Sequence, residues 1–100
     1  MTMDAVAIKP EQIEAFCQKH HIRSLAIFGS VVRDDFSPHS DVDVLVDFEP
    51  GHIPGFQFFV IQAELSQLLG RSVDLQTANF LGPEILPTVL REAVTLYEQA

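Results

Sequence analysis

Cysteine is almost absent from this sequence, since Cys17 is the single one among 100 residues. One thiol cannot form an internal disulfide, and no cysteines and histidines stand at the spacing of common zinc sites. A disulfide-stapled scaffold is therefore excluded. We expect a reducing compartment, the cytoplasm.

Long apolar stretches are missing as well. No run of 18 or more apolar residues is available to span a bilayer, and residues 1–9 lack both the basic start and the apolar stretch of a signal peptide. We therefore expect no membrane association.

Positive charge is scarce: six lysines and arginines face fourteen acidic residues, for a net charge of −8. Such a surface repels phosphate backbones, so stable binding to nucleic acid is not expected. The acidic residues call for another explanation, which could be a metal site, a basic partner or solubility.

The remaining composition is that of an ordinary globular chain, with 47% hydrophobic and 20% charged residues. The length predicts one domain over residues 1–100, with a small core. Apolar periodicity, prolines and glycines predict an α/β (α+β) fold in the order α-β-β-α-β-α. The expected helices span 10–20, 56–69 and a last segment from near Pro87 to Tyr97; the expected strands span 24–28, 42–48 and 72–76, with loops at 49–55 and 77–82.

The second expected strand carries a pair of acids on one face. Val42, Val44 and Val46 alternate with Asp41 and Asp43, so the two carboxylates project side by side. Carboxylates held that close repel each other unless a divalent cation lies between them, and oxygen ligands suit Mg²⁺. Asp74, on another expected strand, could supply a third carboxylate. Three acids could hold two Mg²⁺ ions.

Gly29 and Ser30 directly follow the first expected strand. A glycine lets the backbone approach a ligand, and exposed N–H groups with a serine hydroxyl can hold phosphate. Arg33 adds a planar cation, and Ser40 lies just before the aspartate pair as a further candidate for nucleotide binding. These groups suit phosphoryl or nucleotidyl transfer.

Each feature alone has a plainer interpretation. Gly-Ser after a strand is usually a turn, and alternating aspartates usually form a solvated face. The combined spacing favours the functional interpretation. At roughly 5–7% usage per residue type, Gly-Ser, ten residues, Asp, one residue, Asp arises by chance in well under about one in a hundred chains of this length.

The stretch from Leu25 to Val46, AIFGSVVR and SDVDVLV in outline, resembles the minimal nucleotidyltransferases of the DNA polymerase β superfamily. The segments LLGRSVDLQT and LREAVTLYE resemble later parts of the small antitoxin members. The resemblance implies a small mixed sheet covered by helices on one side. It also implies Mg²⁺ and ATP at the motif, with Asp41 and Asp43 as metal ligands, and Asp74 orienting or deprotonating the attacking hydroxyl.

In the antitoxin branch, the resemblance implies that AMP is transferred to a tyrosine of a HEPN-domain ribonuclease toxin, which silences the toxin. We therefore expect a protein partner and a hetero-oligomer. The alternative is an antitoxin that binds and occludes its toxin without catalysis. One departure is that Asp34 and Asp35 follow Arg33 where the family commonly has glycine, which either weakens nucleotide binding or leaves two acids facing water.

Three other features attract attention in the sequence. His20 and His21 suggest a metal, but without companions at ligand spacing they are interpreted as a helix end. Cys17 is expected to be a core thiol. The phenylalanine-rich start of the helix at 56–69 is expected to be core, and any exposed remainder a partner surface.

Overall fold

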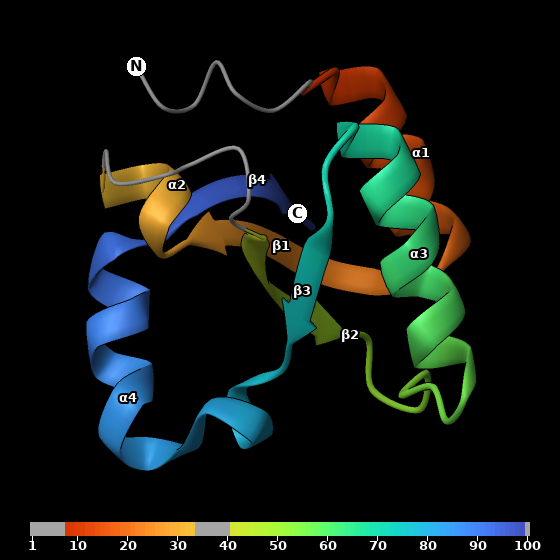
Figure 1. Cartoon of the computed structure of the whole chain (residues 1–100). Coiled ribbons are helices and arrows are strands. Elements are labelled where there is room, and N and C mark those ends of the chain that lie inside the picture. The colour runs from red at the N-terminus through yellow and green to blue at the C-terminus, as the bar shows by residue number, and fades with distance from the viewer. Residues whose placement is uncertain (1–7, 34–40, 100) are drawn as a thin grey trace.

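The computed structural model describes residues 8–33 and 41–99, which form a four-stranded sheet in the order β3-β2-β1-β4 with helices against it (Figure 1). β2 and β3 are parallel, while β1 is antiparallel to both β2 and β4. The expected small mixed sheet with helices is confirmed. The elements are α1 (Pro10–Lys19), β1 (Ile22–Phe28), α2 (Ser30–Arg33), β2 (Val42–Phe48), α3 (Gln57–Leu69), β3 (Val73–Gln76), α4 (Ala78–Glu92) and β4 (Val94–Glu98).

The core lies between the sheet and the pair α1 and α3, which stand together in Figure 1. The alternating valines of β2 are fully or almost fully buried against the two helices, as their period of two predicts. Each large aliphatic side chain buried in this way stabilises the fold by roughly 1.5–3 kcal/mol. Cys17 is fully buried here, and burial raises the pKa of its thiol to about 12, so it is a core thiol as expected.

The ends of α1 and α3 follow from local chemistry. Pro10 begins α1, where a missing N–H costs nothing. Gly70 ends α3 in the left-handed region at φ 72°, which glycine adopts without steric cost. β2 has the expected bounds, and the other predicted strands and the first two helices differ by only one or two residues.

The expected order α-β-β-α-β-α is wrong at two places. A single helical turn, α2, follows β1, and the chain ends in a strand, β4, rather than a helix. Residues 94–98 carry β-branched and aromatic side chains whose apolar spacing also fits a helix. These residues form a strand because they pair with the exposed edge of β1, with Leu25 opposite Tyr97 and Ile27 opposite Val94.

The expected loop at 77–82 is also wrong in part, because α4 begins at Ala78. Thr77 caps it by accepting a hydrogen bond from the N–H of Phe80. Gly82, at φ 79°, interrupts the helix, and Pro83 then suits the first turn of the next helical segment. Within residues 8–33 and 41–99, no helix has the length and apolar character that a membrane span requires.

The opposite face of the sheet is only partly covered, by α4. A groove of about 420 Å³ lies there, lined by Leu45 and Asp47 from β2 and by Leu86 and Leu90 from α4. The acidic face of β2 therefore remains accessible. Helices accordingly lie on both sides of the sheet rather than on one, and the acidic side is the open one.

A charged cluster ties α1 to α3. Glu64 accepts hydrogen bonds from Lys19 Nζ and His20 Nε2, both at 3.1 Å. Partial burial alone would raise the pKa of Glu64, but the two hydrogen bonds hold it below its usual value. His20 ends α1, and its ring binds this carboxylate rather than a helix carbonyl.

We predict that Glu64→Gln lowers the free energy of unfolding by about 0.5 kcal/mol at pH 7, as for an exposed ion pair. A folded pKa below the unfolded value stabilises above the unfolded pKa of about 4.3, and this contribution is lost as pH falls through the folded pKa. Urea unfolding at pH 7 and pH 3 measures the change. Glu98→Gln, at an exposed position on β4, is the control; equal effects of both substitutions would contradict the prediction.

Candidate functional site

Asp43 and Asp74 lie next to each other on the open face of the sheet. They are paired in the parallel register of β2 and β3, and both are half-buried. Gln76, two residues along β3 on the same face, donates from Nε2 to Oδ1 of Asp74 at 2.9 Å. The structure therefore brings together the two carboxylates that the sequence placed on separate strands.

Asp41 lies immediately before β2 and is exposed. The N–H of Val42 donates to the carbonyl of Ser72 at 2.8 Å, which fixes the start of β2 against the start of β3. Residues two apart on an extended chain face the same way, so Asp41 lies on the side of Asp43. Asp41 is thus the outer carboxylate and Asp43 the inner one.

Gly29 meets Asp43 at the end of β1. Phe28 is opposite Asp43 in the antiparallel register, so the next residue faces the carboxylate. A Cβ at Gly29 would collide with Oδ2 of Asp43 and lie 3.1 Å from its Cγ, and the backbone here has φ +78°. Only glycine satisfies both the close approach and the left-handed conformation.

The other residues predicted to bind the nucleotide are Ser30, Arg33 and Ser40. Ser30 begins α2 and is half-buried beside Gly29, and the N–H of Val32 donates to the carbonyl of Gly29 at 3.0 Å. Arg33 ends α2. Ser40, and with it the pair Asp34 and Asp35, lies outside the described residues.

Sequence reasoning missed Glu92, the last residue of α4. Its Oε1 accepts a hydrogen bond from the N–H of Gly29 at 3.2 Å. The two residues are 63 positions apart in the sequence, so no local sequence pattern predicts this contact. The predicted final helix also continued past this point, which concealed that α4 ends at the site.

The arrangement suits a divalent cation. Asp43 and Asp74 are neighbours, Asp41 precedes them, and the missing Cβ of Gly29 leaves room for the inner carboxylate. Hard carboxylate oxygens gathered in this way favour Mg²⁺, which commonly takes one or two carboxylates and completes its coordination with water and substrate phosphates. The donor set therefore fits the metal expected from the sequence.

Comparison with known proteins agrees with this geometry. The family described as polymerase beta, nucleotidyltransferase matches residues 11–100. The chain belongs to this nucleotidyltransferase family. As a member it is a nucleotidyltransferase, and its structure brings Gly29 and Asp43, two residues of the predicted motif, into contact.

Two individual proteins are similar to this chain over most of its length. The protein adenylyltransferase MntA of Thermococcus cleftensis is 40% identical over 93 residues, which cover 84% of this chain and 92% of MntA. A solved structure provisionally assigned as a minimal nucleotidyltransferase is 35% identical at a TM-score of 0.70, covering 85% of this chain and 86% of that one.

A more distant likeness concerns the fold alone. A chain in the solved complex of a tri-AMPylated Shewanella oneidensis HEPN toxin with an MNT antitoxin is 16% identical at a TM-score of 0.65. The match covers 99% of this chain and 74% of that chain.

We predict that Gly29→Ala reduces nucleotidyl transfer at least about a hundredfold, since displacing the inner carboxylate by a fraction of an ångström misaligns the reacting groups. Gly70→Ala is the matched control: its φ is +72°, but nothing lies within 4 Å of an added Cβ. Both variants bear similar backbone strain of about 1–2 kcal/mol, and Gly29→Ala bears the collision in addition. Steady-state transfer assays on folded protein, checked by circular dichroism, would contradict the prediction if the two variants lost activity equally.

Proposed function

We propose that this chain is a protein adenylyltransferase antitoxin, which transfers AMP from ATP to a hydroxyl of a partner toxin and so neutralises it. The observation that carries the proposal is the pairing of Asp43 with Asp74 against Gly29, in a chain 40% identical to MntA over most of both lengths. AMP transfer by such a site requires a donor with a good leaving group, and ATP releases pyrophosphate.

The acceptor in this proposal is a tyrosine of a HEPN ribonuclease toxin. Support comes from the fold shared with the complex of an AMPylated HEPN toxin and an MNT antitoxin. All strands of the described residues belong to one sheet, and the aspartate site lies on its open face. A protein partner would complete the site, giving a hetero-oligomer.

In the proposed reaction, Gly29, Ser30, Arg33 and Ser40 hold the triphosphate, with the Gly29 N–H and the Ser30 hydroxyl as donors. Asp74 orients the tyrosine hydroxyl and accepts its proton. The hydroxyl oxygen forms a bond to the α-phosphorus, the bond to the bridging oxygen breaks, and pyrophosphate leaves.

Asp41, Asp43 and Asp74 would hold Mg²⁺. Three carboxylates supply enough oxygen ligands for two ions. Held there, the metal would supply positive charge that offsets the charge of the triphosphate. Gln76 contributes by holding Oδ1 of Asp74 through its 2.9 Å hydrogen bond, which keeps the carboxylate in one orientation.

We predict that Asp43→Asn lowers the rate of AMP transfer at least about a thousandfold, because the loss of a metal carboxylate removes several kcal/mol of charge stabilisation. Asp47→Asn is the matched control, since Asp47 lies on the same face of β2 but binds Arg23 Nε at 2.9 Å, four residues away from Asp43. Incubation with ATP, Mg²⁺ and the toxin, followed by intact mass of both proteins, measures the adduct. An undiminished adduct with Asp43→Asn would contradict the catalytic role.

Neutralisation by occlusion remains the second candidate, favoured by an exposed apolar surface at the start of α3. Ile53, Phe56, Phe59 and Val60 are 80%, 92%, 64% and 52% exposed. The expected burial of this segment is thus confirmed only for part of it, as Phe58 packs against the core. Exposed apolar side chains in one segment are typical of a partner surface. If Asp43→Asn still neutralises the toxin in cells without an adduct, occlusion suffices.

We predict that Phe56→Ser weakens binding of the toxin at least about tenfold, because an exposed aromatic side chain buried at an interface typically contributes more than 1 kcal/mol. Val94→Thr is the control, as Val94 is an exposed apolar residue on β4, the strand at the other edge of the sheet from β3. Titration calorimetry with purified toxin compares the variants. Unchanged affinity of Phe56→Ser would place the partner elsewhere.

A further inference from the structure

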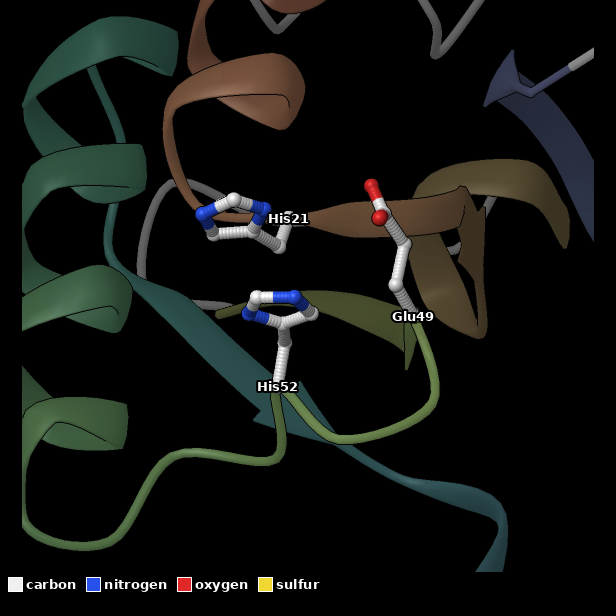
Figure 2. A group of neighbouring side chains, drawn as sticks. All are labelled: His21, Glu49 and His52. Atoms are coloured by element: carbon white, nitrogen blue, oxygen red, sulfur yellow. The ribbon is translucent and has the colours of Figure 1, made fainter.

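A second group of side chains of the kinds that bind metals lies at the other end of the β1–β2 pair (Figure 2). His21 immediately precedes β1, Glu49 immediately follows β2, and His52 lies three residues further on. One ligand atom from each side chain lies within 4.8 Å of the other two. The two imidazole rings stack with centroids 3.9 Å apart and 12° between their planes.

Main-chain hydrogen bonds hold these three residues together. The N–H of Glu49 donates to the carbonyl of His21 at 2.8 Å, and the N–H of His52 donates to the carbonyl of Glu49 at 3.0 Å. The side chains therefore start from fixed backbone positions. This separates the group from exposed acids and histidines that are close only through flexible side chains.

His21 adopts φ 56°, the one positive φ among the described residues other than glycine. Glycine reaches this region without steric cost, whereas a side chain is strained there. His21 directly follows the C-cap of α1, and its N–H donates to the carbonyl of Gln18, so the helix end accounts for this conformation. The backbone therefore fixes the position from which the imidazole projects.

Two imidazole nitrogens and one carboxylate oxygen are ligands of borderline divalent metals, of which Zn²⁺ is the common example. Zinc bonds of roughly 2.0–2.2 Å place ligand atoms about 3–3.5 Å apart. The three atoms already lie within 4.8 Å of one another, so side-chain rotation, which the exposed rings of His21 and His52 allow, can bring them to this spacing. Gln99 Nε2 already donates to Oε2 of Glu49 at 3.0 Å and orients the carboxylate from outside, as second-sphere partners do.

We propose that His21, Glu49 and His52 form a binding site for Zn²⁺ or a similar divalent transition metal, separate from the aspartate site. Seven residues of β1 lie between the two sites, which corresponds to about 20 Å. Three protein ligands leave a coordination position for water. A bound ion joins the end of α1 to the loop before α3, so it stabilises the folded chain.

Zinc titration of the untagged chain tests this site. Titration calorimetry and thermal unfolding are run with Zn²⁺ in excess Mg²⁺, and repeated in Asp43→Asn, so that the aspartate site does not contribute. We expect one Zn²⁺ per chain and a rise in the unfolding temperature with zinc concentration. Co²⁺ should give the visible absorption bands of a low-symmetry site with nitrogen ligands.

Single substitutions then assign the ligands. His52→Ala and Glu49→Gln should each weaken zinc binding at least about tenfold. His21→Gly removes a ligand while relieving the positive φ, so it should unfold at an equal or higher temperature without zinc and lose the zinc-dependent rise. His20→Gln, adjacent in sequence but bound to Glu64, should keep wild-type zinc affinity. Absence of stoichiometric zinc binding by the wild type, or unchanged affinity of His21→Gly, would overturn the proposal.

Discussion

The antiparallel register of β1 with β2 is the constraint on which the rest of the structure depends. Pairing Phe28 with Asp43 brings Gly29 against the inner carboxylate at one end, and pairing Ile22 with Phe48 brings His21 to Glu49 at the other. A slip of one residue would turn the valines of β2 to the open face and the aspartates into the core. Burial of those valines therefore fixes both ends of the pair at once.

Strongly periodic segments could be predicted from the sequence. The alternation in β2 gave its bounds and the face of Asp43, because one buried face leaves a clear period of two. The start of α1 at Pro10 and the end of α3 at Gly70 were equally clear. For the site, the sequence spacing predicted that Gly29 and Asp43 belong together, and the antiparallel return of the chain does place them in contact.

What escaped prediction depends on contacts between distant segments. Residues 94–98 have apolar spacing that fits a helix or a strand, and only the free edge of β1 decides between them. Glu92 reaches Gly29 because α4 ends there and β4 turns back along β1. His20 and His21 do form the end of α1, as predicted, but the stacking of His52 on His21 escaped prediction because the two residues are 31 positions apart in the sequence.

The edge strand β4 thus links the fold to the chemistry of the site. Pairing Val94 with Ile27 holds the end of α4 beside the end of β1, and this places the carboxylate of Glu92 on the Gly29 N–H. That N–H is the donor that the proposed function gives to a phosphate oxygen. In the proposed reaction, a triphosphate would have to take this hydrogen bond from Glu92 while a divalent cation offset the charge of the carboxylates around it. Nucleotide and metal binding would then be coupled at this position, because phosphate without the cation would meet the uncompensated charges of Asp43 and Glu92.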